Sequence, residues 1–338
     1  MTLQVIWFIL VFVLLAGYIV LDGFDLGVGV LHLLAQNEYE CRININAIGP
    51  VWDGNEVWLL TAGGALFAAF PPVYAAAFSG FYIALMLVLA MLMFRAVSLE
   101  FRGKVDSEEW RAIWDYGFGI SSTLLAILFG VAIGNVLLGV PLAPDGTYTG
   151  TFLELLNPYA ILIGVLALVT FIMHGAIFMA GKTEGPMQAR MIMYARRAWL
   201  GFAVLFFAIT VYTRWAAPSL FSHFSTNYIA LAFLLLIVAG SIGLAITLRV
   251  SQLKIAMLAS CAIVGSLMGL AAAGLFPRLL PSRTDPAASL TIYNSSSTPR
   301  TLGVMLVIAL IGMPLVIGYT AVIYHIFCGK VVLHEDSY

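Results

Sequence analysis

Two pairs of acidic residues stand inside apolar stretches of the sequence, where an ionisable side chain is unexpected. Asp22 and Asp25 lie three residues apart in YIVLDGFDLGVG, and with Tyr18 they share one face of a helix. Asp53 and Glu56 have the same spacing in PVWDGNEVWLL. Carboxylates take up and release protons, and each one inside a bilayer costs roughly 2.5 to 3.5 kcal/mol on insertion scales. The pattern therefore predicts a proton-conducting relay lined by protein or water.

These acids also have structural explanations. Asp53 and Glu56 stand near the expected start of a helix, where free backbone N–H groups stabilise carboxylates, so both roles stay open for them. For Asp22 and Asp25 we favour the relay, because acids deep in a membrane usually mark ion or proton paths. For Asp115, in WRAIWDYGFG, we favour a cap at a helix N-terminus over a place in the relay.

His174 is the histidine that the pattern places well inside an apolar stretch, FIMHGAIFM. One imidazole could ligate a haem iron or belong to the relay, but we favour a core histidine with satisfied hydrogen bonds. Two glycine pairs, Gly23 with Gly27 and Gly63 with Gly64, are explained by close helix packing. The sequence has no soluble-enzyme triad, phosphate loop or HExxH motif, so we predict neither a catalytic residue nor a metal site in this chain.

The composition shows which solvent surrounds these residues. Of the 338 residues, 62% are hydrophobic and only 10% are charged, and the mean hydropathy is +1.01, whereas soluble domains carry about 25% charged residues. The net charge of -1 offers no basic surface for nucleic acid. Cys41, Cys261 and Cys328 lie far apart and form no CxxC motif, so we interpret them as small apolar side chains. The chain is predicted to be an integral membrane protein.

Apolar windows of about 20 residues, the length needed to cross a bilayer, recur along the whole chain. The second and third windows are separated only by Pro71 and Pro72, which favours a tight helical hairpin. The first is longer than a signal-peptide core and lacks a basic leader, so we expect it to be retained. The sequence predicts one all-α membrane domain, residues 1–338, with about nine spans near residues 4–34, 50–70, 73–98, 112–140, 155–181, 189–217, 226–248, 253–277 and 301–328.

Basic residues are distributed unequally between alternate connections. The larger set is Arg42, Arg95, Arg102, Lys104, Arg111, Lys182, Arg190, Arg196, Arg197, Arg249, Lys254 and Lys330. The smaller set is Arg214, Arg278, Arg283 and Arg300. Because positive charge is retained in the cytoplasm, we expect the N-terminus outside and the C-terminus inside the cell. At about 1.5 Å per residue, Asp25 and Asp53 then lie roughly 14 Å and 5 Å from the cytoplasmic ends of their helices, so the relay is fed from the cytoplasm.

Longer motifs carry a resemblance to a known family. DGFDLGVG is followed by WDGNEVWLLTAGGALFAAFPPVYAAAFSGFY, LLNPYAILIG and ASLTIYNSSS, within residues 18–310. In this order they resemble subunit II of the cytochrome bd-type quinol oxidases. The resemblance implies two four-helix bundles plus one extra helix, packed on a similar subunit I. It also implies a complex in the bacterial cytoplasmic membrane that oxidises quinol near its outer face and reduces dioxygen to water with cytoplasmic protons.

The resemblance also implies where cofactors and site residues lie. Two b-type haems and one haem d belong to subunit I, so this chain is expected to bind none firmly, although family members can hold a quinone in this subunit. The expected partners are subunit I, quinol, dioxygen and lipid, with small single-helix accessory subunits in some complexes. Asp22, Asp25 and Asp53 match the start of the family's proton path, and Trp58 matches an oxygen-access tryptophan. Glu56 departs from the pattern, since many relatives carry glutamine there.

Two other functions stay open at this stage. Intramembrane acids and glycine-interrupted helices also suit a stand-alone proton-coupled transporter, although no inverted repeat of the kind common in such carriers is detected in the sequence. A purely scaffolding subunit would use none of the acids for proton transfer. The leading hypothesis is a haem-free subunit that supports the oxidase and delivers cytoplasmic protons.

Overall fold

Helices account for nearly all of the regular structure. The computed structural model describes residues 2–221 and 227–333. An antiparallel pair of short strands, β1 (Arg278–Leu280) and β2 (Leu290–Thr291), pairs Arg278 with Thr291. The helices are α1 (Leu3–His32), α2 (Glu38–Ile48), α3 (Trp52–Ala69), α4 (Pro71–Gly80), α5 (Tyr82–Phe101), α6 (Glu108–Leu138), α7 (Pro158–Lys182), α8 (Gly185–Ala216), α9 (Tyr228–Arg249), α10 (Leu253–Leu275) and α11 (Pro299–Ile326).

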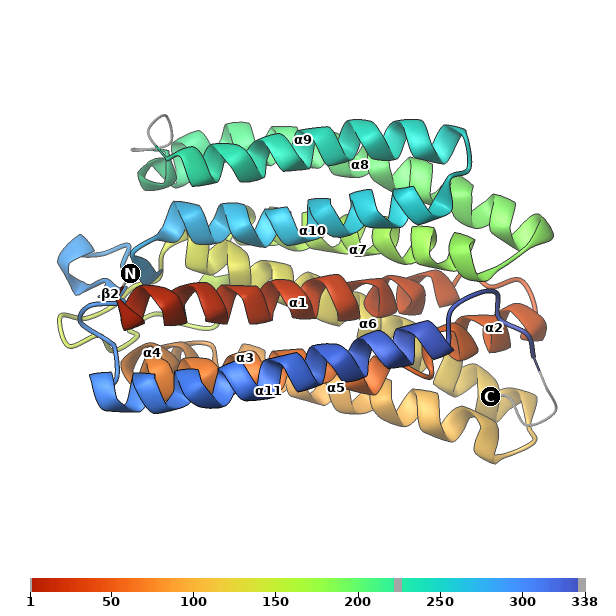
Figure 1. Cartoon of the computed structure of the whole chain (residues 1–338), viewed down its shortest axis with the longest axis horizontal. Coiled ribbons are helices and arrows are strands. Elements are labelled where there is room, and N and C mark those ends of the chain that lie inside the picture. The colour runs from red at the N-terminus through yellow and green to blue at the C-terminus, as the bar shows by residue number, and fades with distance from the viewer. Residues whose placement is uncertain (1, 222–226, 334–338) are drawn as a thin grey trace.

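The long helices lie side by side along one axis (Figure 1). Helix α1 runs through the middle and contacts α3, α6, α7 and α10, while α11 lies along α1 and α3. The pair β1–β2 and α4 lie at one end of the bundle, and α2 lies at the other. We call these the ribbon end and the α2 end. Since α1 starts at the ribbon end and α11 finishes at the α2 end, an odd number of helices crosses the bundle.

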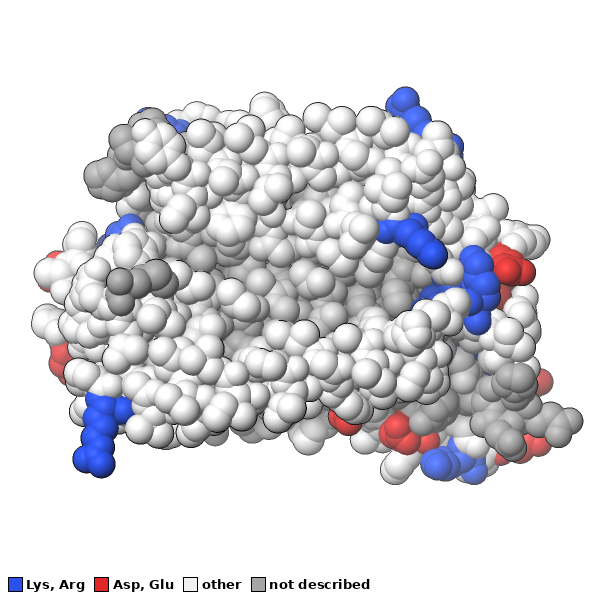
Figure 2. Space-filling view, in the orientation of Figure 1, with Lys and Arg blue, Asp and Glu red and all other residues white. Residues whose placement is uncertain are grey.

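The prediction of a polytopic, all-α membrane protein is confirmed. Among the described residues, eight helices are long and apolar enough to cross a membrane: α1 and α5 to α11. In the view of Figure 2 charged side chains lie toward the two ends, and the middle of the molecule is almost free of them. Helix α3 has 18 residues but begins with polar side chains and falls outside the eight. The count of nine spans therefore stays a prediction.

Several predicted boundaries were wrong in an informative way. The span expected over residues 73–98 is divided at Phe81 into α4 and α5, although α3 does end directly before Pro71. Residues 278–300, which connect the last two predicted spans, contain β1 and β2. Helix α2 was not expected at all, because its 11 polar and apolar residues form no membrane-length window. Short elements escape a search that depends on the thickness of the bilayer.

Glycines allow α1 to approach α7 at backbone distance. A Cβ at Gly27 would lie 1.9 Å from the carbonyl oxygen of Phe171, and one at Gly175 would lie 2.6 Å from the carbonyl carbon of Gly27. A Cβ at Gly23 would lie 2.9 Å from the Phe171 ring. The packing role predicted for Gly23 and Gly27 is therefore confirmed.

The same explanation was wrong for Gly63 and Gly64 within this chain. Among the described residues, no atom lies within 4 Å of a Cβ built on either one. Both lie on α3, on a side that the chain leaves partly or fully exposed. These glycines keep a strip of the α3 surface flat without packing against another helix of the same chain.

Gly27→Ala tests the contact between α1 and α7. We expect the free energy of unfolding to fall by about 1 to 3 kcal/mol, because the added methyl group forces the two backbones apart. Thermal unfolding of the detergent-solubilised protein measures the change. Gly243→Ala in α9 is the control, since a Cβ there meets no described atom within 4 Å. Equal unfolding temperatures for the two variants would contradict the close approach.

Candidate functional site

One face of α1 carries the polar groups that the sequence singled out. Tyr18, Asp22 and Asp25 are all buried, and the two aspartates have no exposed surface. The prediction that this face looks inward is confirmed. Helical geometry explains it, because positions separated by three and four residues fall on one side of a helix. The apolar residues around them on α1 then meet lipid or other helices.

Asp22 is held by an arginine from α5. Nη2 of Arg95 donates to Oδ1 of Asp22 at 2.7 Å, and Nη1 donates to Oδ2 at 3.0 Å. Nη1 also donates to Glu56 at 3.1 Å. Arg95 is the largest of the fully buried side chains. A two-point pair of this kind is strong and fixes the carboxylate in one orientation, so Asp22 is permanently compensated by a positive charge.

Asp25 has neutral partners. Nδ2 of Asn55 donates to Oδ2 of Asp25 at 2.7 Å and to the carbonyl of Leu21 at 3.2 Å, and the Tyr324 hydroxyl on α11 donates to Oδ1 of Asn55 at 3.0 Å. The other oxygen of Asp25, Oδ1, makes no hydrogen bond to any protein group that the structure describes. Asp25 is thus buried without a cation bonded to it, although it feels the charges of Asp22 and Arg95.

A cavity of about 480 Å³ opens beside this network, between the start of α3 and the end of α11. Asp53 is exposed and lines this cavity. Asn55, which is hydrogen-bonded to Asp25, also lines the cavity. The structure therefore joins Asp22 and Glu56 through Arg95, places Asp25 with Asn55 beside them, and leaves Asp53 at the neighbouring cavity. The lining also includes Trp52, Glu100, Tyr319 and Tyr324.

Arg95 was misread in the sequence, where it was counted with the basic residues of a connection. It lies inside α5, and the apolar run LMLVLAMLMFRAV that surrounds it could have shown this. A buried acid needs a counter-charge, so a basic residue in a membrane-length window is the first candidate. Removing Arg95 from the count leaves the excess of positive charge on the same side.

His174 and Asp115, two other candidates from the sequence, lie outside this network. His174 is fully buried, with Nδ1 2.7 Å from the Ser260 hydroxyl and Nε2 2.9 Å from the carbonyl oxygen of Val20. Both ring nitrogens are occupied, as in a core histidine, so His174 does not fit a haem ligand. The capping role of Asp115 was wrong, because α6 begins earlier at Glu108 and is capped by Ser107.

Glu56 and Trp58 are the remaining site residues that the sequence predicted. The side chain of Glu56 is 21% exposed and bonds Arg95, so it does not cap α3. Trp58 packs flat on α1, where a Cβ at Gly17 would lie 2.3 Å from its ring. Its place on an oxygen route stays a prediction.

A second cavity, of about 270 Å³, lies among α6 to α10. Its lining is almost entirely apolar, and the Tyr159 and Thr213 hydroxyls, 3.0 Å apart, are bonded to each other. Apolar cavities with a few polar groups suit flat or chain-like apolar molecules. The lining is therefore compatible with a quinone.

The fold and the buried network together define a polytopic membrane protein whose interior carries titratable groups. The model of the family "Cytochrome bd terminal oxidase subunit II" matches residues 3–327. The cytochrome bd-I ubiquinol oxidase subunit 2 of Escherichia coli (strain K12) is 38% identical over 364 residues, which cover 98% of this chain and 96% of that protein. The chain belongs to the family of cytochrome bd terminal oxidase subunit II.

Further relatives agree with this membership. The cytochrome bd ubiquinol oxidase subunit 2 of Bacillus subtilis (strain 168) is 36% identical over 336 residues, covering 99% of this chain and 98% of that protein. A chain in the structure of the bd oxidase from Geobacillus thermodenitrificans superposes with a TM-score of 0.80 at 18% identity, covering 97% of this chain and 99% of that chain. At this identity the likeness shows the fold.

Arg95→Gln tests the buried pair. We expect a loss of about 3 to 5 kcal/mol in stability, or failure to assemble, because the change leaves the Asp22 charge buried without a partner. Arg111→Gln is the control, since Arg111 pairs with the fully exposed Asp106 at the surface and should change stability little. The assembled fraction and the unfolding temperature measure both. If Arg95→Gln is as stable as the control, the pair does not hold α1 and α5 together.

Proposed function

We propose that this chain is the non-haem subunit of a membrane quinol:oxygen oxidoreductase, which packs against the haem-bearing subunit I and helps to deliver cytoplasmic protons for the reduction of dioxygen to water. The complex lies in the bacterial cytoplasmic membrane, with the α2 end of this chain facing the cytoplasm. The observation that carries the proton role is Asp25, a buried carboxylate without a bonded cation, linked through Asn55 to an open cavity.

The two buried aspartates, Asp22 and Asp25, have different roles. If Asp22, Asp25 and Glu56 were all ionised, Arg95 alone would leave two uncompensated negative charges in an apolar interior, which is costly. Arg95 fixes the ionised form of Asp22. Asp25 is then the group that can hold a proton and release it, because only hydrogen bonds to a neutral amide position it.

Protons reach Asp25 from the cavity. Asp53, an exposed residue of the cavity lining, concentrates protons there, and water in the cavity passes them toward Asn55 and Asp25. The family's haems are assigned to subunit I and supply the oxygen chemistry when bound. This chain contributes the passage, the charge that fixes Asp22, and the carboxyl that holds the proton.

Subunit I is proposed to cover the exposed side of α3 and α11. On this surface Gly54, Gly63 and Gly64 of α3 and Gly303 and Gly312 of α11 meet no described atom within 4 Å of a built Cβ. Small residues on a membrane-facing helix let another helix approach closely. The exposed part of Glu56, on the same helix α3, would be costly against lipid and is better covered by protein.

Asp25→Asn tests the proton role. The amide keeps the shape and the bond to Asn55 but cannot carry a proton, so we expect turnover and cytoplasmic proton uptake of the assembled complex to fall about tenfold or more. Oxygen consumption and pH changes are measured on the purified complex in liposomes. Glu154→Gln is the control, because Glu154 forms an exposed ion pair with Arg283 at the ribbon end. It should change neither turnover nor proton uptake.

The outcomes separate the alternatives. Unchanged turnover and proton uptake in a correctly assembled Asp25→Asn complex would leave a purely scaffolding subunit. A chain that purifies without a haem-bearing partner and moves a solute in liposomes would instead favour a stand-alone transporter. Co-purification with a haem-rich partner, seen in the absorption spectrum and on a gel, supports the oxidase.

A further inference from the structure

The polar face of α1 continues beyond Asp25 to the α2 end. At about 100° per residue, Tyr18, Asp22, Asp25, Gly29 and His32 fall within an arc of about 80°. All five are buried. With a rise of about 1.5 Å per residue, His32 lies roughly 10 Å along the helix from Asp25. We call this face the polar stripe of α1, and it joins the buried network to the end of the helix.

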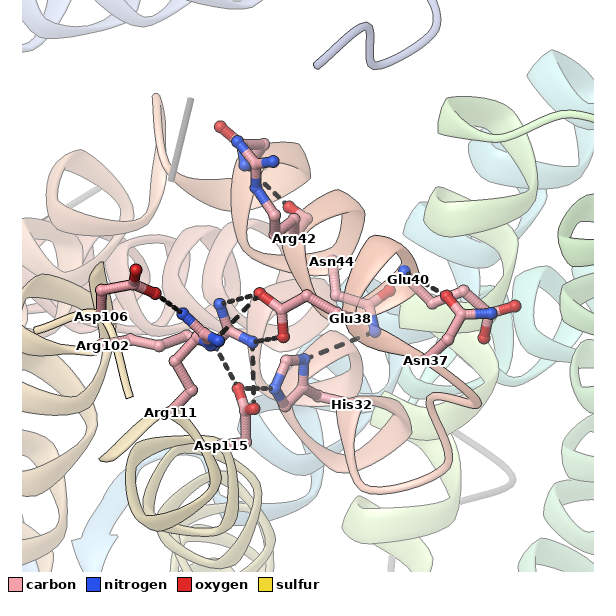
Figure 3. Close-up of polar contacts among 11 residues, drawn as sticks. His32, Asn37, Glu38, Glu40, Arg42, Asn44, Arg102, Asp106, Arg111 and Asp115 are labelled. Carbon is pink, nitrogen blue, oxygen red and sulfur yellow. Dashed lines mark hydrogen bonds and ion pairs between the residues drawn. The ribbon is translucent and has the colours of Figure 1, made fainter. Parts of the chain in front are cut away.

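His32 ends the polar stripe with two hydrogen-bonded neighbours (Figure 3). Its Nε2 lies 2.7 Å from Oδ1 of Asp115 on α6, and its Nδ1 lies 3.5 Å from the amide nitrogen of Asn44 on α2. His32 is 3% exposed, whereas the Asp115 side chain is 21% exposed. The pair therefore reaches the water at the α2 end through Asp115. The imidazole can accept a proton at one ring nitrogen and release one at the other.

The other groups around His32 hold this pair in place. Arg102 donates to both oxygens of Asp115 and to both oxygens of Glu38, as Figure 3 shows. His32, Cys41 and Asp115 lie close enough to suggest a metal site. Burial raises the pKa of the Cys41 thiol to about 11, and Arg102 already occupies the Asp115 carboxylate, so a metal ion is disfavoured there.

Ser122 of α6 lies between the two ends of the polar stripe. It touches Gly29, where a Cβ would lie 2.1 Å from the Ser122 hydroxyl oxygen. Ser122 is fully buried, and its hydroxyl makes no hydrogen bond to any described protein group. Its neighbours Ser121 and Thr123 instead donate to carbonyls of their own helix, as helical hydroxyls commonly do.

Three buried oxygen atoms between Asp25 and the α2 end share that property, and so does the Tyr18 hydroxyl at the other end of the polar stripe. Oδ1 of Asp25, Oγ of Ser122 and Oδ1 of Asn44 have no hydrogen-bond partner among the residues that the structure describes. Buried polar groups are nearly always hydrogen-bonded, and ordered water supplies the bond where protein does not. Each of the three atoms can therefore bind a water molecule between Asp25 and His32.

We propose that His32 and Asp115 form a second proton entrance, which supplies Asp25 through water at Ser122 and is separate from the cavity at Asp53. A cytoplasmic proton converts the His32 imidazole to an imidazolium, which the Asp115 carboxylate stabilises, and the imidazolium releases a proton along water to the Asp25 carboxylate, which becomes a carboxylic acid. The His32 ring is neutral again afterwards, so one proton moves from the cytoplasm to Asp25 and no bond between heavy atoms changes. This inference rests on the proposed function of Asp25.

Two parallel entrances make a distinctive prediction for combined variants. His32→Gln, Ser122→Ala or Asp53→Asn alone should lower turnover only about twofold, whereas Asp53→Asn with Ser122→Ala should lower it about tenfold or more. Oxygen consumption and cytoplasmic proton uptake of the assembled complex in liposomes measure this. Ser121→Ala in the Asp53→Asn background is the matched control, because Ser121 is equally buried but bonds the Phe118 carbonyl.

Turnover that stays at the Asp53→Asn level after Ser122→Ala or His32→Gln is added would overturn the second entrance. An equal loss in the Ser121→Ala control would also overturn it, because packing alone would then explain the effect. Asp25→Asn separates the two proposals. If Asp25→Asn changes neither turnover nor proton uptake, the proposed function fails. If Asp25→Asn lowers proton uptake but adding Ser122→Ala or His32→Gln to Asp53→Asn has no further effect, only the second entrance fails.

Discussion

The ion pair between Asp22 and Arg95 is the interaction on which the rest of the structure depends. A charge in an apolar interior is tolerated only with a close and well-oriented partner, and here the two side chains meet at two points with no exposed surface. The pair ties the central helix α1 to α5 on one side, while glycine contacts tie α1 to α7 on the other. With α1 fixed from both sides, its acidic residues have one possible direction.

Function follows from the difference between two neighbouring acids. Asp22 is paired with a guanidinium, whereas Asp25 is positioned by Asn55 and, behind it, by Tyr324. A group that moves protons must be free to change charge, and a fixed charge nearby sets the field in which it does so. In the proposed function the same helix provides a permanent charge and a mobile one, three residues apart.

Much of this arrangement could be predicted from local sequence. Helical spacing was enough to place Tyr18, Asp22 and Asp25 on one inward face, because periodicity is a property of a single segment. The partners were not predictable in the same way. Tyr324 lies 269 residues from Asn55, and nothing local to α11 indicates that it meets α3. Arg95 stands inside an apolar run of the sequence but was assigned to a connection between spans. Helix α2 is too short to form an apolar window of membrane length.

The central claim is that Asp22 is a fixed charge and Asp25 is the proton carrier. Infrared spectroscopy of the assembled complex tests it most directly, because a protonated carboxyl group has its own C=O stretching band, which shifts in D2O. We expect such a band during turnover that disappears in Asp25→Asn and persists in Asp22→Asn. A band that disappears in Asp22→Asn and persists in Asp25→Asn would contradict it.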